Sequence, residues 1–181
     1  MKFRLATIED VPEIVKVKVD TWRTTYQAIF SSEFLRNLSY EENEIRWRQR
    51  FEETDKGWFI YVAENDSNKI IGFAMGNLEQ SNLSLKVPGI RHYIGELMAI
   101  YVVQEHQRKK IGLKLVKLIV EHLLENDIKS MIVWVLKGNP FCNFYEHIGG
   151  KYIGEKMLEI DAANYVELAY GWKDITKILE L

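Results

Sequence analysis

Residues 96–113 decide the fold of this chain, and they read ELMAIYVVQEHQRKKIGL. The run Tyr93–Val103 is apolar over most of its length and predicts a long strand. A short polar and basic segment follows, after which the residues from Ile111 to Asn126 carry apolar side chains at helical spacing. The sequence therefore predicts a strand, a tight basic loop and a helix that is buried over most of its circumference.

The start of this predicted helix is suited to binding phosphate. The first turn of a helix presents unpaired N–H groups and the positive end of the helix dipole, and a tight preceding loop makes the amides converge. Arg108, Lys109 and Lys110 add positive charge at this point, and Gly112 has no Cβ to keep a ligand or a neighbouring strand from the backbone. The basic cluster has a plainer interpretation as the solvated face of a helix.

A second informative segment covers residues 131–150 and reads MIVWVLKGNPFCNFYEHIGG. Met131–Leu136 predicts an apolar strand. A helix is expected to start near Asn139 and Pro140, with Asn139 as the N-cap and Pro140 at the first helical position.

Together these two segments resemble the GNAT family of N-acetyltransferases, of the kind that acts on small-molecule or peptide amines. Residues 96–103 and 107–113 are similar to motif A of that family, Gln/Arg-x-x-Gly-x-Gly/Ala, which wraps the pyrophosphate of CoA. Gln107 and Gly112 match its first and last positions, whereas Lys110 replaces the usual first glycine. We expect helical dihedrals at Lys110, because this residue should lie at the helix start and can itself reach a phosphate; a positive φ would cost about 1–2 kcal/mol. Residues 139–150 are similar to motif B.

The resemblance extends to nearly the whole chain and implies its fold. That fold is α/β (α+β), with a mixed, mostly antiparallel central sheet of about six to seven strands flanked by helices, in a single domain over residues 1–181. The remaining pattern agrees with it. Strands are expected at residues 3–5, 58–63, 70–75, 151–160 and 165–172, helices after Thr7 and around residues 32–38 and 42–51, and a loop over residues 77–89.

The resemblance also implies acetyl-CoA as the acetyl donor and a set of residues around it. A backbone N–H near Ile100 to Val102 would meet the thioester carbonyl, at a point where many members split the strand with a bulge. Asn139 would contact the pantetheine arm in addition to capping a helix. The implied cofactor-binding residues are Ile100, Tyr101, Val102, Gln107, Arg108, Lys109, Lys110, Ile111, Gly112, Leu113, Asn139, Asn143 and Tyr145.

Two residues are candidates for the chemistry. Family resemblance places Tyr145 near the sulfur, where a phenol can donate a proton or a hydrogen bond to the departing thiolate. Its plainer role is that of a core aromatic residue. Glu96 resembles the glutamate that several members use, through a water, to take the proton of the acceptor amine. Its plainer role is to pair with a lysine or an arginine at the strand end.

The acceptor side is expected on the first helix. Trp22 and Tyr26 lie four residues apart on one helical face and could flank an amine by cation–π contact, with Arg23 beside them. Together with Glu96 they are the candidate substrate-binding residues. The plainer role of Trp22 and Tyr26 is that of apolar side chains on the core-facing side of the helix, which the pattern slightly favours.

Net charge and composition narrow the range of possible functions further. The formal charge of −2 argues against nucleic acid as a partner, and we expect neither a signal peptide nor a membrane span. A single cysteine suits a reducing cytoplasm. The four histidines show no metal-ligand spacing with each other or with Cys142, so no metal is expected. The aromatic closing strands would suit a homodimer.

The function predicted from the sequence is therefore acetyl transfer from acetyl-CoA to a primary amine by direct attack in a ternary complex. The acceptor could be a polyamine, another small amine, or an amine of a peptide or protein. Two alternatives stay open at this point: a CoA-binding or sensing module without turnover, and a polyanion-binding protein that uses the basic segment.

Overall fold

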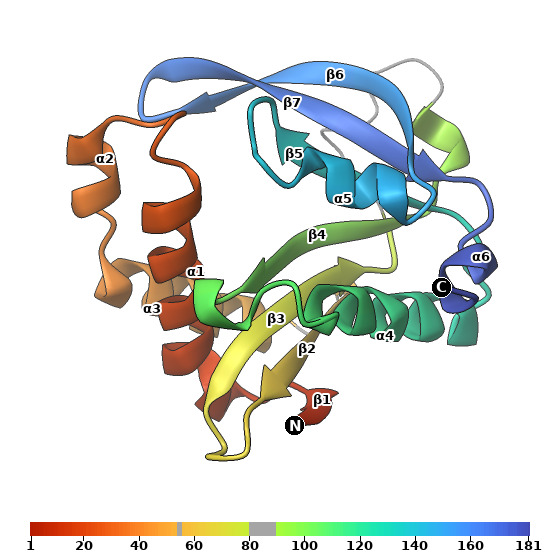
Figure 1. The fold of residues 1–181 in the computed structure, drawn as a ribbon, viewed down its shortest axis with the longest axis horizontal. Helices are drawn as coiled ribbons and strands as arrows, with labels where there is room; N and C mark the ends of the chain where they lie inside the picture. The colour runs from red at the N-terminus through yellow and green to blue at the C-terminus, as the bar shows by residue number, and fades with distance from the viewer. Residues whose placement is uncertain (54–55, 80–89) are drawn as a thin grey trace.

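The computed structural model describes residues 1–53, 56–79 and 90–181. A seven-stranded sheet forms the centre, in the order β1-β2-β3-β4-β5-β7-β6, and helices cover both of its faces (Figure 1). The predicted mixed, mostly antiparallel sheet is confirmed, because β4 and β5 form its parallel pair and the other neighbours are antiparallel. The strands are β1 (Lys2–Leu5), β2 (Trp58–Glu64), β3 (Ile70–Asn77), β4 (Gly95–Val102), β5 (Met131–Leu136), β6 (Lys151–Ile160) and β7 (Ala163–Trp172).

The helices begin and end close to the positions that the sequence predicts. Ser31 and Ser39 cap α2 and α3 by accepting hydrogen bonds from backbone N–H groups. The α-helices are α1 (Val11–Thr25), α2 (Ser32–Arg36), α3 (Tyr40–Glu52), α4 (Ile111–Glu125), α5 (Cys142–His147) and α6 (Thr176–Leu179). Short 3-10 helices are η1 (Ile8–Asp10), η4 (Ile90–His92) and η5 (Gln104–His106). Of the loop predicted over residues 77–89, residues 80–89 lie outside the described part of the chain.

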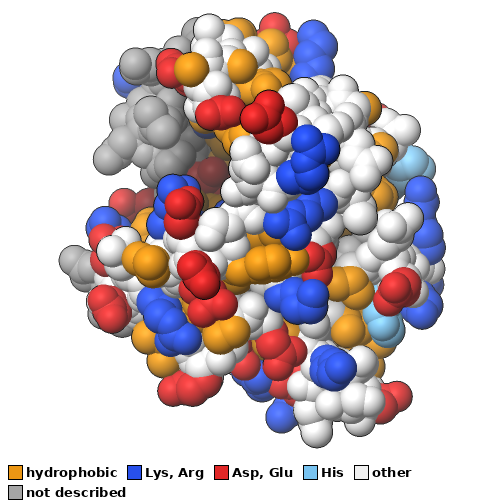
Figure 2. Space-filling model, turned by 90° about the vertical axis from the view of Figure 1, so that its left-hand side faces the viewer, with side chains coloured by type: hydrophobic (Ala, Val, Ile, Leu, Met, Phe, Trp, Pro, Cys, Tyr) orange, Lys and Arg blue, Asp and Glu red, His pale blue; other side chains and the backbone are white. Residues whose placement is uncertain are grey.

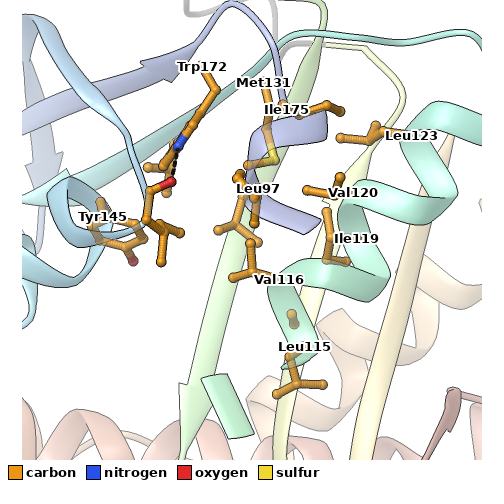
Figure 3. Close-up of a cluster of buried hydrophobic side chains, with 14 of the residues drawn as sticks. Leu97, Leu115, Val116, Ile119, Val120, Leu123, Met131, Tyr145, Trp172 and Ile175 are labelled. Atoms are coloured by element: carbon orange, nitrogen blue, oxygen red, sulfur yellow. Dashed lines mark hydrogen bonds between the residues drawn. The ribbon is translucent and has the colours of Figure 1, made fainter. Parts of the chain in front are cut away.

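The core has two layers because alternate side chains of the strands point to opposite faces. On β2, Phe59 and Ala63 belong to the cluster beneath α4, whereas Ile60 and Val62 belong to the cluster beneath α1 and α3. Figure 3 shows the first cluster, in which α4 contributes Leu115, Val116, Ile119, Val120 and Leu123. Each of these five side chains is fully buried, which holds the start of α4 firmly against the sheet.

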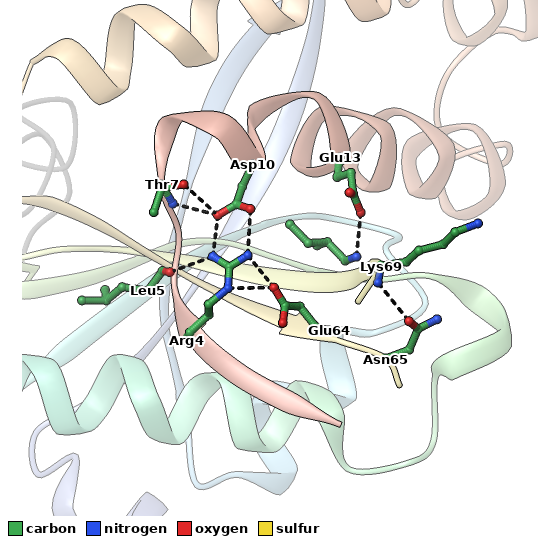
Figure 4. Close-up of polar contacts among 9 residues, drawn as sticks. Arg4, Leu5, Thr7, Asp10, Glu13, Glu64, Asn65 and Lys69 are labelled. Carbon is green, nitrogen blue, oxygen red and sulfur yellow. Dashed lines mark hydrogen bonds and ion pairs between the residues drawn. The ribbon is translucent and has the colours of Figure 1, made fainter. Parts of the chain in front are cut away.

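An ion network anchors the first strand (Figure 4). The Arg4 guanidinium lies 2.6 Å from a carboxylate oxygen of Asp10 in η1, and its Nε donates to Glu64 of β2 at 2.7 Å. Asp10 also accepts a hydrogen bond from the Thr7 N–H at 2.8 Å. These contacts fix the entry into α1, the helix that carries the candidate acceptor residues.

Candidate active site

Strands β4 and β5 diverge, and the candidate site lies where they separate. Their ladder contains only three residue pairs, from Gly95 opposite Met131 to Leu97 opposite Val133. A register shift against β3 makes Met98 the extra, bulged residue, because Met75 pairs with Ala99 and Gly76 pairs with Leu97. Beyond the bulge β4 and β5 are no longer paired, as Figure 1 shows.

The separated edge of β4 presents backbone groups to this opening. The Val103 N–H donates to Ile71 of β3, and strand alternation then directs the N–H groups of Ile100 and Val102 away from β3, toward the opening. The Val102 carbonyl, on the same edge, accepts a hydrogen bond from the Gln107 side chain at 2.9 Å. Gln107 therefore ties the basic loop to the strand instead of reaching outward.

The basic loop enters α4 through two left-handed residues. Arg108 and Lys110 have φ values of 60° and 61°, and Lys110 is the N-cap of α4. Our expectation of helical dihedrals at Lys110 is therefore wrong: the position has the conformation that favours the family's usual glycine. A lysine there is strained by about 1–2 kcal/mol.

The start of α4 has the features that an anionic ligand requires. No side chain caps the helix, its first turn contains no acidic residue, and the side chains of Arg108, Lys109 and Lys110 are exposed. An alanine Cβ built at Gly112 would meet only Ile100 and Phe144, at 3.7 and 3.8 Å, so the protein does not crowd this backbone. We call residues 108–113 the cradle. Within it, Ile111 is buried and Leu113 is half-buried. These groups fit the diphosphate of CoA.

The approach to α5 differs from the prediction. The helix begins at Cys142 with Phe141 as its N-cap, so Asn139 is not the N-cap and Pro140 is not the first helical residue. Instead, the Asn139 side chain accepts the Phe141 N–H at 2.8 Å and donates to the Tyr26 hydroxyl at 3.2 Å. A tight turn thus precedes the helix and aims the Asn139 amide across to α1.

Tyr145 lies on α5 with its side chain 7% exposed. Behind it, the turn Ile148–Gly150 is fixed by the Trp172 indole, which donates to the Ile148 carbonyl at 2.8 Å (Figure 3). Among the described residues, none hydrogen-bonds the Tyr145 hydroxyl, and burial raises the pKa of this phenol well above its usual range. The phenol therefore stays protonated at neutral pH and is a permanent hydrogen-bond donor. Asn143, in the first turn of the same helix, is exposed.

A network of aromatic side chains crosses the opening beside Tyr145. The Trp22 indole N–H donates to the Tyr101 hydroxyl at 2.9 Å, and Tyr101 packs against the hydrophobic cluster that contains Tyr26. Electrostatic interactions of Tyr145 with Tyr26 and Tyr101 put the three phenols near one another. The structure thus brings the candidate residues of α1, β4 and α5 together.

Glu96 faces the α1 side of the sheet. Its neighbours Gly95 and Leu97 face α4, so strand alternation directs the Glu96 side chain to the other face, where it is 5% exposed. Arg23 is not part of the opening. Its guanidinium donates to the carbonyls of Leu35 and Leu38 and to the Tyr40 hydroxyl, so it holds α1 to the α2–α3 connection.

Sequence reasoning missed a small pocket at the mouth of this opening. It is lined by Thr24, Thr25, Gln104, Gln107, Pro140 and Phe141. The pocket joins the end of α1 to the basic loop and to the turn before α5. No sequence signal links these three segments, because only the tertiary fold brings them together.

Comparison with known proteins decides the family. The model of the Acetyltransferase (GNAT) family matches residues 19–149. The uncharacterized N-acetyltransferase YuaI of Bacillus subtilis (strain 168) is 35% identical over 178 residues, which cover 98% of this chain and 96% of YuaI. This chain belongs to the GNAT acetyltransferase family.

Solved structures share the GNAT fold. The PaiA N-acetyltransferase of Thermoplasma acidophilum, solved in complex with coenzyme A, superposes with a TM-score of 0.66 at 20% identity, covering 95% of this chain and 100% of that one. A chimera of the spermidine N-acetyltransferase SpeG from Vibrio cholerae gives 0.65 at 14% identity and covers 100% of both chains. At these identities the likeness establishes the fold and not the acceptor.

Membership in the GNAT family confirms the predicted enzyme class, an acetyl-CoA-dependent N-acetyltransferase. Within the described ranges, no group of three His, Cys, Asp or Glu side chains could hold a metal ion. None of the helices in this part of the GNAT chain is long and apolar enough to cross a membrane.

Proposed function

We propose that this GNAT enzyme, as one domain, transfers acetyl to a primary amine by direct attack, with Tyr145 and Glu96 on opposite sides of the reacting carbon. The observation that carries the proposal is the opening between β4 and β5. Tyr145 belongs to the cluster beneath α4 and Tyr101 to the cluster beneath α1 and α3, and strand alternation directs Glu96 to the face opposite α4. A donor bound at the α4 cradle and an acceptor entering from α1 would therefore meet between the strands.

The cradle residues would hold acetyl-CoA. The N–H groups of Ile111, Gly112 and Leu113, with the cations of Arg108, Lys109 and Lys110, would bind its diphosphate. Gln107 would hold the loop in place, and Asn139 and Asn143 would border the pantetheine arm. When bound, acetyl-CoA supplies an acetyl thioester whose thiolate leaves as the amide forms.

The protein's own groups would then act at three atoms. The N–H groups of Ile100 and Val102 would donate to the acetyl oxygen, where negative charge develops. The protonated phenol of Tyr145 would donate to the departing sulfur. Because burial raises the pKa of this phenol, its main contribution is a hydrogen bond to the sulfur. The proton that the attacking nitrogen loses as the amide forms would neutralise the thiolate.

Glu96 would accept the proton of the incoming ammonium through a water, since an amine must be neutral to attack. Trp22 and Tyr26 would border the acceptor, and the indole of Trp22 would hold the Tyr101 hydroxyl in position. The expected homodimer and cytoplasmic location stay predictions from the sequence.

Thiol release from acetyl-CoA tests this proposal. The acceptor panel contains polyamines, aminoglycosides, amino acids, and peptides with free N-termini or lysines. We expect one amine class to support release and Tyr145→Phe to lower kcat about tenfold to a hundredfold with little change in acetyl-CoA affinity. Tyr152→Phe is the matched control, since this tyrosine is 56% exposed on β6.

Two results would contradict parts of the proposal. If Tyr145→Phe does not change the rate of turnover, the phenol has no role in the mechanism, although the protein is still a transferase. Tight acetyl-CoA binding with no turnover of any amine would contradict the primary-amine acceptor. Glu96→Gln tests the base separately: we expect it to abolish the rise of kcat/KM with pH that a carboxylate base produces.

A further inference from the structure

Two half-buried cations on the acceptor side of the sheet form no salt bridge with a carboxylate of residues 1–53, 56–79 and 90–181. The Lys18 ammonium of α1 donates to the Asn43 side-chain oxygen of α3 at 2.7 Å, and Arg50 of α3 has the Met75 sulfur, at 3.8 Å, as its hydrogen-bond acceptor. Over the described residues, neither cation forms a salt bridge, whereas Arg4, Lys16, Arg46, Lys56, Lys137 and Lys156 each do.

The surroundings of Arg50 are aromatic. Its guanidinium lies 5.6 Å from the Trp47 ring and 5.3 Å from the Trp58 ring. A guanidinium has five N–H donors in a fork that matches a carboxylate. Within the described residues its hydrogen-bond acceptor is the Met75 sulfur, and the Glu53 carboxylate acts on it electrostatically without forming a salt bridge. Partly buried charges in proteins are normally paired, so most of the donors of this guanidinium are left, within the described part of the chain, for a further anion.

Both cations are close to the reaction site. Met75, which Arg50 contacts, pairs with Ala99 directly after the bulge of β4, and Arg50 acts electrostatically on Tyr101. The Lys18 ammonium lies 5.8 Å from the ring of Trp22, whose indole N–H is bonded to Tyr101. Met75 and Tyr101 belong to the same cluster beneath α1 and α3, and Lys18 lies over the ring of Trp22, so both cations lie near the phenols that border the opening.

Two carboxylates lie on the strands beside the same phenols. Glu96 points to this face, and Glu167 of β7 also acts electrostatically on Tyr101. Glu167 is 15% exposed and pairs with Lys156 at 3.4 Å. The acceptor side therefore has cations on α1 and α3 and carboxylates on β4 and β7.

We infer that the acceptor is a small amino-carboxylate, an amine that also carries a carboxylate, and that Arg50 and Lys18 bind this carboxylate while the amine faces Glu96. The inference rests on the proposed function for the position of the amine. A polyamine fits less well, because its second ammonium would lie against Arg50 or Lys18. Burial, with Arg50 and Arg46 nearby, lowers the pKa of Lys18 to about 8, which is the electrostatic cost that a bound anion would relieve.

Matched acceptors that differ in one terminal group test the inference. Glycine, 4-aminobutanoate and 6-aminohexanoate are compared with the diamines and the monoamines of the same lengths, as acetyl acceptors of the whole protein. We expect kcat/KM to be at least tenfold higher for one amino-carboxylate than for its diamine and its monoamine. A diamine or monoamine that reacts as well as every amino-carboxylate would overturn the inference and leave the proposed function intact.

Variants then locate the carboxylate site. Arg50→Gln and Lys18→Met should each lower the preference for the amino-carboxylate over the monoamine by about tenfold to a hundredfold, the value of a charge-assisted hydrogen bond. Arg48→Gln, an exposed arginine of the same helix, is the control and should leave the preference unchanged. An unchanged preference in both Arg50→Gln and Lys18→Met would overturn the assignment.

A binding measurement separates this inference from the proposed chemistry. Calorimetry with 4-aminobutanoate and 6-aminohexanoate on the CoA-saturated protein needs no turnover. Binding that Arg50→Gln abolishes, without acetylation, would support the carboxylate site and contradict the proposed transfer. If neither compound binds and neither is acetylated, the carboxylate site is wrong.

Discussion

The indole N–H of Trp22 and the hydroxyl of Tyr101 are 2.9 Å apart, and they join α1 to β4 across 79 residues of sequence. Tyr101 lies just past the bulge at Met98, on the part of β4 that is separated from β5. Tyr101 also packs against the cluster that contains Tyr26, and the Tyr26 hydroxyl accepts a hydrogen bond from Asn139. The contact therefore couples the acceptor helix to the edge of the acetyl-CoA site.

Removing either partner of this contact should lower activity without unfolding the protein. We expect Trp22→Phe and Tyr101→Phe each to lower kcat/KM for the amine about threefold to tenfold, and the dissociation constant of acetyl-CoA to stay the same. In a double-mutant cycle the two changes should show a coupling of about 1 kcal/mol, because both remove one hydrogen bond. Fully additive effects on kcat/KM would show that the contact has no role in catalysis.

Replacing Lys110 by glycine should separate backbone strain from charge. Lys110→Gly relieves the left-handed φ of 61° and should raise the free energy of unfolding by up to about 1 kcal/mol, measured in urea. The same change removes a cation from the cradle, so acetyl-CoA should bind about threefold more weakly by calorimetry. Lys109→Gly is the control: the φ of Lys109 is not positive, so glycine there should destabilise the protein. Equal stability changes at the two positions would contradict the assigned strain.

The Arg4 network should matter for stability and not for activity. Arg4→Met leaves the carboxylates of Asp10 and Glu64 without their cation, and we expect a loss of about 2–4 kcal/mol at pH 7 with kcat unchanged. The hydrogen bonds from Arg4 hold the pKa of Asp10 below its usual range. This stabilisation is complete above the ordinary pKa of Asp, about 3.9, and is lost as the pH falls through the lower folded value. Urea unfolding from pH 7 to pH 2 should show the variant and the wild type converging at the acid end; a constant difference would contradict this.

Lys18 should lower the free energy of unfolding, and this loss should become smaller as the pH rises. Its pKa falls to about 8 in the folded protein, because of burial and then of Arg50 and Arg46; Asn43, its hydrogen-bond partner, is neutral. The folded state thus disfavours the charged form, and the cost is largest below pH 8 and disappears as the pH rises toward the ordinary lysine value near 10.4. Lys18→Met should therefore stabilise the protein by about 1–3 kcal/mol at pH 7 and by much less at pH 10.

Thermal unfolding at the two pH values measures this difference. Lys16→Met is the control, because Lys16 is exposed on the same helix and its pKa is raised by Asp20. A destabilised Lys18→Met variant at pH 7 would show that Lys18 serves the fold rather than a ligand.

Much of the architecture could be predicted from the sequence, because it rests on local patterns. The apolar period of α4, the strand Met131–Leu136 and the hairpin of β2 and β3 agree with prediction within a few residues. The start of α5 could not be predicted, since Asn139 can either cap a helix or form a tight turn, and its contact with Tyr26 favours the turn. The φ of Lys110 was also predicted wrongly, because packing of α4 against the sheet compensates for a strain that local preference disfavours.

By itself, the sequence determined the order of strands and helices, the basic loop before α4 and the two motifs by which the chain resembles its family. These properties follow from residues that are neighbours in the chain, so periodicity and capping chemistry reveal them. Only the tertiary structure decided where β4 and β5 separate, that Trp22 is bonded to Tyr101 and Asn139 to Tyr26, and that Lys18 and Arg50 lie on the acceptor side without a salt bridge among the described residues. The physical reason is that burial and charge pairing depend on groups far apart in sequence, and folding alone brings those groups into contact.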